Sequence, residues 1–427
     1  MLVALPFFSS AQENSPYSRY GVGNLQPQGN VLNRAMGGVS AAYSDISTIN
    51  FINPASYGNL LYTTLDIGAE VDSRTLKSVS PLAKFTSNNA LFSYIQIGVP
   101  LVNLNRTAKT NKGWGINFGL KPVSKINYKI SNFGRISNID SVATIYEGTG
   151  GINEAFVGTG VKIKDFSFGF NVGYLFGNKN YSTRLIFIND TVNYLKSNSS
   201  TKTSFGGLSF NAGLQYSLKI KEGILKLGAH GSLQRSYSAS QDILRESFSY
   251  NGASGATDKL DSIYELSGKK GTVVLPANYA VGFMVEKPHV SYGLDFELAN
   301  WDNYSFYNQR DNVKNTWKVK GGFQYLPASA TSASGKYWDF VKYRAGFFAG
   351  PDYITANKNL PQYGVTIGGG FPLKLKRSFY ETQYSVMNLA LEYNTRGNAS
   401  NNIRENILRV CVGFSLSDVW FRRYKYN

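Results

Sequence analysis

The stretch Phe166-Ser-Phe-Gly-Phe-Asn-Val-Gly-Tyr-Leu-Phe176 decides the fold class of this chain. Every second residue is Phe, Val or Tyr, and the residues between them are Ser, Gly, Asn and Leu. Successive side chains of a β-strand point to opposite faces, so the pattern predicts a strand with one apolar and one mainly small or polar face. The same alternation returns in residues 114–121, 208–218, 290–298, 387–394 and 408–416.

Alternation of this kind fits either a soluble β-sandwich or a membrane barrel. Several segments exceed about ten residues, whereas strands of soluble proteins average five or six. The second face is crowded with Gly, Asn and charged residues, and aromatic residues gather near the segment ends, as in the girdles of outer-membrane barrels. We therefore predict an all-β, transmembrane antiparallel β-barrel, with the soluble sandwich as the alternative.

Composition limits the chemistry that the chain supports. The 427 residues include 44 Lys and Arg, 27 Asp and Glu, 2 His and 1 Cys, for a net charge of +17. A lone Cys excludes an intrachain disulfide and a Cys-based metal site, and two His leave little material for zinc or an imidazole triad. The Gly-rich stretches 148–151 and 368–370 lack the Lys-Ser/Thr of a phosphate loop. We expect no enzyme activity, cofactor or metal.

The longest uncharged run, 85–105, contains too many Ser, Asn and Gln residues for a membrane helix. The pattern instead predicts about fourteen strands. Their expected ranges are 60–72, 84–100, 112–131, 152–164, 166–186, 201–220, 223–248, 271–287, 289–306, 313–325, 338–350, 362–373, 384–396 and 404–419.

The connections between these strands predict the topology. Tight connections at 162–165, 219–223 and 286–289 follow the fourth, sixth and eighth strands, and long polar gaps at 132–151, 187–200 and 249–270 follow the third, fifth and seventh. Short periplasmic turns and long extracellular loops are typical of outer-membrane barrels. An even strand number then places both termini in the periplasm of a Gram-negative bacterium.

The chain divides into four predicted parts. Residues 1–11 combine an apolar run with Ser9-Ser10-Ala11 and indicate a signal peptide, although the missing basic region leaves the true start codon open. Residues 12–58 are too long for a linker and are rich in small residues, so we predict a hatch, or plug, inside the barrel of residues 59–419. The basic, aromatic tail 420–427 is expected at the periplasmic membrane interface or against a partner.

The predicted hatch contains an Ala/Gly-rich stretch, then Asp45-Ile-Ser-Thr, then Asn53-Pro54-Ala55 directly before the first strand. This order resembles the N-terminal hatch of the long-chain fatty-acid transporter (FadL) family. The resemblance implies a 14-stranded, plugged barrel that passes hydrophobic substrates through a lateral opening, and it implies a hatch motif at Gly37, Gly38, Asn53, Pro54 and Ala55. The prefix Ser15-Pro-Tyr-Ser-Arg-Tyr-Gly21-Val-Gly23 departs from that pattern and resembles a divergent branch, some members of which serve in secretion or barrel-assembly machines.

Alternation also directs many polar side chains toward the lumen, where we expect them to pair with Arg19, Arg34 and Asp45 of the hatch. These candidate lumen residues are Asp66, Glu70, His230, Asp295, Glu297, Lys318, Lys320, Arg344, Glu392 and Arg409. The excess positive charge is expected in loops and turns that bind anionic lipid head groups. The sequence contains no nucleic-acid-binding module.

Two functions fit these features. The first is passive passage of a hydrophobic ligand, such as a long-chain fatty acid, through a plugged lumen. The alternative is a non-transporting structural subunit of an outer-membrane assembly or secretion machine, with outer-membrane protein or lipoprotein partners. The hatch favours transport, whereas the charged lumen and the basic-aromatic tail favour the subunit.

Overall fold

The computed structural model describes residues 14–419, apart from 81, 103–106, 108–109, 138, 189–191, 193, 251–256, 329–334, 356–357, 374–383 and 399. The predicted signal peptide, 1–11, and the predicted tail, 420–427, lie outside the described residues.

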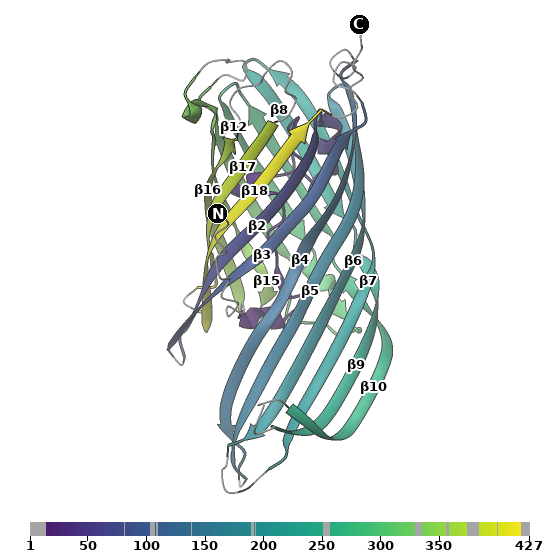
Figure 1. Ribbon diagram of the computed structural model, residues 1–427, viewed down its shortest axis with the longest axis vertical. Helices are drawn as coiled ribbons and strands as arrows, with labels where there is room; N and C mark the ends of the chain where they lie inside the picture. Colours follow the sequence, from purple (N-terminus) through teal and green to yellow (C-terminus); the bar gives the residue numbers. More distant parts are fainter. Residues whose placement is uncertain are drawn as a thin grey trace, which may run out of the picture.

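The wall of the molecule is one antiparallel sheet that closes on itself (Figure 1). Its first strand, β2 (Thr63–Ser78), pairs along its whole length with its last, β18 (Ile403–Asp418). The straight strands between them are β3 (Ala83–Pro100), β4 (Lys112–Arg135), β5 (Ser141–Ile163), β6 (Phe166–Phe187), β7 (Lys196–Ile220), β12 (Val290–Ala299), β14 (Thr316–Tyr325), β15 (Lys342–Thr355), β16 (Asn359–Pro372) and β17 (Tyr384–Arg396).

Two further crossings of the wall are kinked. In one, β8 (Gly223–Ser232) continues into β9 (Arg235–Tyr250), and in the other β10 (Thr257–Leu275) continues into β11 (Asn278–Glu286). With each kinked pair taken as one crossing, and with the two-residue strands β1 (Asn24–Leu25) and β13 (Ser305–Phe306) set aside, the wall has 14 crossings. The predicted 14-stranded antiparallel barrel is therefore confirmed.

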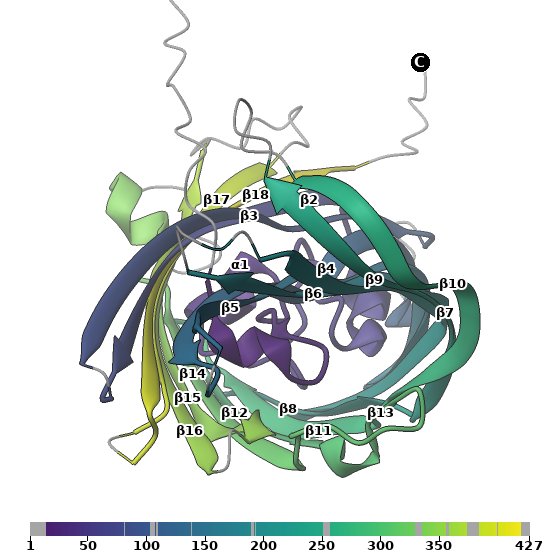
Figure 2. The same cartoon turned by 90° about the horizontal axis from the view of Figure 1, so that it is seen from below.

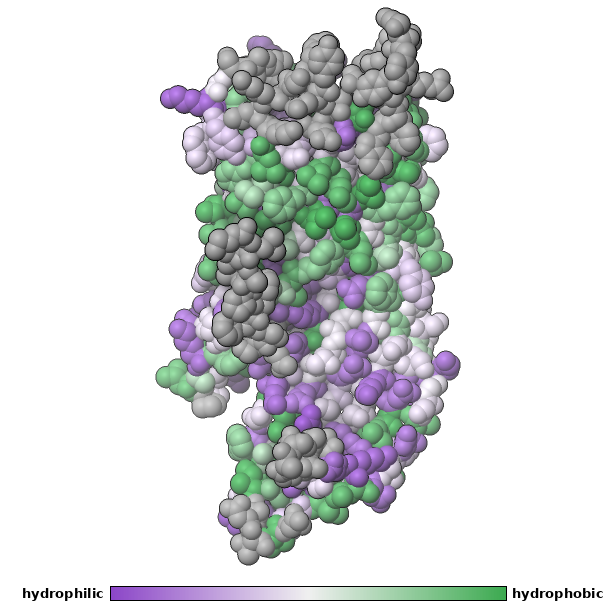
Figure 3. Space-filling view, in the orientation of Figure 1, coloured by the Kyte–Doolittle hydropathy of each residue, from purple (hydrophilic) through white to green (hydrophobic). Residues whose placement is uncertain are grey.

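Apolar side chains form a belt around the outside of the wall, visible as the green zone in the upper half of Figure 3. On β6, Phe168 and Phe170 point outward and are 43% and 51% exposed, whereas Asn171 points inward and is 7% exposed. An exposed apolar surface of this kind requires lipid rather than water around it. We call this belt the apolar band, and the architecture is that of an outer-membrane β-barrel.

The barrel has two different ends. The turn end carries the tight turns 164–165, 221–222 and 287–289, and the far end lies opposite. At the far end β4, β5, β6, β7, β9 and β10 run well beyond the apolar band as a sheet on which hydrophilic and apolar side chains are mixed, which we call the extension (Figures 1 and 3).

The long loops predicted at the far end are mostly wrong, because the extension has strands there. Most of the expected gaps 132–151, 187–200 and 249–270 is strand, and the actual connections there span only 136–140, 188–195 and 251–256. Outside lipid the outer face of a strand does not have to be apolar, so the regular alternation is lost although the backbone ladder continues. The predicted separation of short and long connections is also wrong in part, because the turn end carries the longer links 101–111, 326–341 and 373–383. The link 326–341 includes the short helix η4 (Tyr337–Phe340).

The N-terminal segment, residues 14–62, lies inside the wall, as the purple ribbon in Figure 2 shows. It contains η1 (Pro16–Arg19), β1, α1 (Val31–Ala35) and η2 (Pro54–Asn59), and most of its side chains are buried. The Asn30 side chain accepts a hydrogen bond from the Asn33 N–H and so caps α1. At the far end, η3 (Trp301–Asn303) follows β12. None of the helices in the described part of the chain is long and apolar enough to cross a membrane.

Candidate functional site: the filled lumen and its openings

A buried cluster of four charges joins the N-terminal segment to the seam between the first and last strands. Arg34 of α1 donates a hydrogen bond to Glu70 on β2, and its second terminal nitrogen lies 3.7 Å from Glu392 on β17. Arg409 on β18 lies 2.6 Å from Glu392 and 3.4 Å from Glu70. All four residues are at most 5% exposed. Positive and negative charges thus alternate, and the predicted lumen residues Glu70, Glu392 and Arg409 meet at Arg34.

A second charged cluster lies farther along the same seam. Glu405 on β18 accepts hydrogen bonds from Arg74 at 2.7 Å and from Ser15 at 2.6 Å. Arg396 lies 3.3 Å from Glu405 and 3.0 Å from Asp352. This cluster was not predicted from the sequence, although Arg74 and Glu405 lie on the same strand faces as Glu70 and Arg409 and follow the same alternation.

On the opposite wall, Asp295 of β12 holds the backbone of the N-terminal segment. Its carboxylate accepts the N–H groups of Ser40 at 2.6 Å and Ala41 at 2.8 Å. Beside it, Lys320 on β14 pairs with Glu297 at 2.5 Å. These predicted lumen residues therefore line one side of the barrel interior, as does Lys318.

Asp66 and Arg344 were also predicted as lumen residues that pair with charges of the N-terminal segment, but their hydrogen-bond partners are uncharged side chains. Asp66 accepts hydrogen bonds from Tyr94, Gln96 and Ser415 at 3.0 to 3.2 Å. Arg344 donates to the side-chain amides of Gln324 and Asn388, each at 2.9 Å. Both residues are buried.

The motif residue Asn53 bridges the N-terminal segment and the wall. Its amide donates to the carbonyl groups of Ala41 at 2.6 Å, Leu214 at 3.2 Å and Ala229 at 3.3 Å. Its side-chain oxygen accepts the Ala55 N–H at 3.1 Å. A side chain at this junction thus satisfies backbone groups from three separate parts of the chain.

The neighbouring Pro54 packs against glycines of the wall. A Cβ atom built on Gly160 or Gly169 would lie 2.3 or 2.4 Å from the Pro54 carbonyl oxygen. Gly37 and Gly38 have φ angles of +69° and +88°, and the Gly37 N–H donates to Thr366 at 2.9 Å. The motif therefore lies where backbone approaches backbone closely. Its role as a movable hatch stays a prediction.

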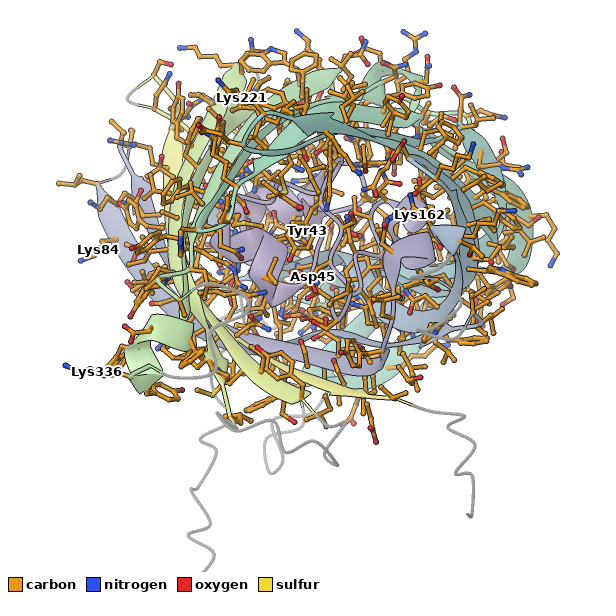
Figure 4. The ribbon with its side chains drawn as sticks, turned by 90° about the horizontal axis from the view of Figure 1, so that it is seen from above. Tyr43, Asp45, Lys84, Lys162, Lys221 and Lys336 are labelled. Atoms are coloured by element: carbon orange, nitrogen blue, oxygen red, sulfur yellow. The ribbon has the colours of Figure 1, made fainter. Side chains whose placement is uncertain are left out.

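At the turn end, Tyr43 and Asp45 lie inside the mouth of the barrel (Figure 4). Asp45 lies 3.5 Å from the Lys342 ammonium group and accepts a hydrogen bond from the Ser47 N–H. Burial alone would raise the pKa of Asp45, but Lys342 and the Ser47 hydrogen bonds outweigh it and lower the pKa to about 2. The segment is therefore also tied to the wall at this end.

The lumen retains a cavity of about 330 Å³ beside the N-terminal segment. Its apolar lining includes Leu25, Ile52, Ile152, Phe210, Tyr237 and Trp301. Its charged lining includes Lys121, His230, Glu297 and Lys318. The cavity is amphipathic and therefore has room for a small molecule with a large apolar surface.

The wall opens between β3 and β4. These strands pair only where Ile95–Pro100 meets Gly115–Leu120, and beyond that point they separate. Pro122 lies two residues beyond Leu120 and has no N–H to donate to β3. An opening of about 430 Å³, lined by Leu91, Phe92 and Leu120, occupies this split and shares Gln26 and Lys121 with the lumen cavity.

A second interruption lies at the kink between β8 and β9. Residues 207–211 of β7 lie between its pairing with β9 and its pairing with β8. At this position the Arg235 guanidinium lies 4.4 Å from the centre of the Phe210 ring, and both residues line the lumen cavity. The described residues contain no group of His, Cys, Asp and Glu that could hold a metal ion.

The whole chain, residues 1–427, matches the family described as BamG. The chain belongs to the BamG family. No curated protein matches it. Among solved structures, the toluene transporter TodX of Pseudomonas putida has a TM-score of 0.56 at 15% identity, over 94% of this chain and 100% of TodX.

Two other channels of the same architecture give similar values. A FadL homologue of Pseudomonas aeruginosa has a TM-score of 0.58 at 11% identity, over 93% of this chain and 99% of its own. The toluene transporter TbuX of Ralstonia pickettii has a TM-score of 0.52 at 11% identity, over 91% and 98%. The predicted FadL-type barrel fold is confirmed, and the barrel of this BamG-family chain resembles those of hydrophobic-compound channels.

Proposed function

We propose that this BamG-family barrel is a passive channel for hydrophobic compounds, which exchange between the lumen cavity and the bilayer through the split between β3 and β4. The observation that carries the proposal is that the two spaces lie side by side and share the lining residues Gln26 and Lys121. The similarity to toluene transporters supports the same ligand class. Passage down a gradient needs no cofactor and no chemical step.

The geometry suggests how an apolar compound would move. Phe92 and Leu120 are 46% and 38% exposed on the outer face of the wall, so the split opens onto lipid. A hydrophobic compound that leaves through the split never crosses open water, which removes the cost of hydrating its apolar surface. The cations that line the lumen would orient any ligand with an anionic group.

We place the barrel in the outer membrane with both termini in the periplasm and the extension outside the cell. The tight turns at one end and the long hydrophilic extension at the other support this orientation. Anionic lipid head groups are the expected partners of the basic residues near the membrane surface.

Replacing Pro122 tests the channel. Pro122→Thr restores a backbone N–H, and we expect β3 and β4 to pair farther and narrow the split. Uptake of toluene by proteoliposomes should fall several-fold, while the amount of folded barrel on heat-modifiability gels stays unchanged. Ser182→Thr in the extension is the control. Unchanged uptake with Pro122→Thr, or no uptake above protein-free liposomes in the parent protein, would overturn the proposal.

A second candidate is a non-transporting subunit of an outer-membrane assembly or secretion machine. The observation that favours it is the fixation of the N-terminal segment, which Asn53 and the Arg34 cluster bind to several strands at once. Protein or lipoprotein partners would then be the ligands. A barrel that purifies with a stoichiometric partner and supports no toluene flux would replace the channel proposal with this one.

A further inference from the structure

The far-end half of β3 has an open edge. Pairing with β4 is confined to Ile95–Pro100, so among the described residues no strand covers the β4-facing edge of Ala83–Asn88. On its other side this stretch pairs in regular register with β2, from Ala83↔Ser78 to Asn88↔Ser73. It therefore presents a straight row of backbone N–H and C=O groups.

The sequence of this edge offers little protection against another strand. Lys84 is its only charge, and its side chain projects away from the barrel (Figure 4). Proteins usually blunt open edges with charges, prolines or bulges. The edge of Ala83–Asn88 has one terminal Lys and no register shift.

Two strands of the extension have edges that are covered or interrupted. The β4 edge is covered by the N-terminal segment, since Ser15 N–H donates to the Asn127 carbonyl at 3.0 Å and the Asn14 amide bonds both backbone groups of Lys129 at 3.1 Å. The β10 edge is interrupted by three register shifts between Lys259 and Lys269 and carries several charges. The edge of Ala83–Asn88 has neither device.

We propose that the β3 edge at Ala83–Asn88 is a docking site for an extended segment of a partner protein, which adds a strand to the sheet. The complementary chemistry is a row of backbone donors and acceptors, which an extended polypeptide supplies and a lipid or a small hydrophobic compound does not. Exposed Phe85 and Leu82, at 50% and 91%, provide apolar anchors beside the row. This site lies beyond the opening at Leu91 and is independent of the proposed channel.

A second copy of the chain is a poor occupant of this edge. All copies insert in one membrane in the same orientation, so their β3 strands run in the same direction across it. Two β3 strands would then meet in parallel, whereas every neighbouring pair of wall strands here is antiparallel. A partner segment free to run antiparallel to β3 satisfies the geometry better.

Hydrogen exchange measured on the full chain tests the proposal. We compare purified protein in detergent with the same protein in native outer-membrane vesicles. Amides of Ala83–Asn88 that point away from β2 should exchange at least tenfold more slowly in the native membrane, while those of the β10 edge exchange equally in both. Equal exchange at Ala83–Asn88, or equal slowing of both edges, would overturn the proposal.

The double variant Thr86→Lys with Asn88→Lys adds the protection that the edge lacks. It should fold normally and lose the tenfold protection in native vesicles, because charges on an edge oppose strand addition. Asp258→Lys with Asp261→Lys on β10 is the matched control and should leave protection at β3 intact. Protection that survives the β3 variant would show that something other than an added strand covers this edge. Toluene flux is expected to be unaffected by either variant, so this test and the channel test fail separately.

Discussion

The apolar band and the extension are made of the same strands but meet different solvents. Along β6 the outward residues change from Phe166, Phe168 and Phe170 in the band to Asn178 and Ser182 in the extension, yet the pairing with β5 and β7 continues through both. The backbone ladder therefore does not depend on the lipid. What the lipid imposes is the alternation of side chains.

The ion pairs of the two regions differ as well. Within the band, Arg34 and Glu70 form an ion pair whose side chains are 2% and 3% exposed. On the outer face of the extension, Lys129 and Glu147 lie 2.9 Å apart with side chains 59% and 21% exposed. The first pair is removed from water and surrounded by the N-terminal segment, whereas the second is solvated.

Removing one charge from each pair should show the largest contrast. Arg34→Met leaves buried carboxylates without their full compensation, which typically costs about 3–5 kcal/mol. Lys129→Met removes an exposed partner, and the loss should stay below about 1 kcal/mol. Urea unfolding of both variants in lipid bilayers measures the difference. Similar midpoints for the two would mean that the lumen is wet and that the N-terminal segment is only loosely held.

A charge on the outer surface tests where the band ends. Phe170→Lys places an ammonium group in the lipid and should cost about 2–4 kcal/mol near the bilayer midplane. Ser182→Lys on the same face of β6 lies in the extension, opposite Glu147, and should be nearly neutral. The fraction of heat-modifiable, folded barrel in the membrane measures both. Poor folding of Ser182→Lys would place the membrane boundary farther along the strand.

Asn171 would be a misleading control for that experiment, although it points into the lumen. Its side chain accepts a hydrogen bond from Tyr57 at 3.0 Å and donates to the Phe51 carbonyl at 3.1 Å. Asn171→Lys would therefore disturb the N-terminal segment as well as the strand.

Sequence predicted the band far better than the extension. The outward position of Phe168 and Phe170 and the number of crossings followed from alternation, because burial in lipid enforces it at every second residue. The extension carried no such signal, and its strands were read as loops. For the Arg34 cluster, the sequence predicted which residues face the lumen but not how they pair. Alternation assigns Glu70 and Arg409 to the inward face of their strands, but it does not determine which charge each one meets.

The split between β3 and β4 was also beyond the sequence. Pro122 predicts an interruption of the backbone hydrogen bonds between β3 and β4. Whether β3 stays beside β4 or separates from it depends on what fills the lumen behind the two strands. Gln26 of the N-terminal segment lies behind the split and is a contact distant in sequence. Such contacts leave no periodic trace.

The smallest expected difference in stability is between alanine variants of two glycines, Gly213 in the band and Gly134 in the extension. In the band, a Cβ atom added at Gly213 would lie 1.9 Å from the Asn53 side-chain oxygen, so Gly213→Ala must displace the motif residue that bridges segment and wall. Overpacking of this kind costs about 1–3 kcal/mol. In the extension, a Cβ atom at Gly134 on β4 would meet no atom within 4 Å, and its φ angle is outside the left-handed region. Gly134→Ala should therefore be neutral or stabilise by about 0.4–1 kcal/mol, through the unfolded chain.

Unfolding in lipid bilayers measures the stability of these two glycine variants. Hydrogen exchange of the Ala55 amide, which donates a hydrogen bond to the Asn53 side-chain oxygen, reports the local effect. Exchange at Ala55 should quicken in Gly213→Ala and stay unchanged in Gly134→Ala. If Gly213→Ala left both stability and Ala55 exchange unaltered, Asn53 would have room to move without loss. The N-terminal segment would then be a loosely seated hatch, as a channel with a moving plug requires, rather than a fixed part of the wall.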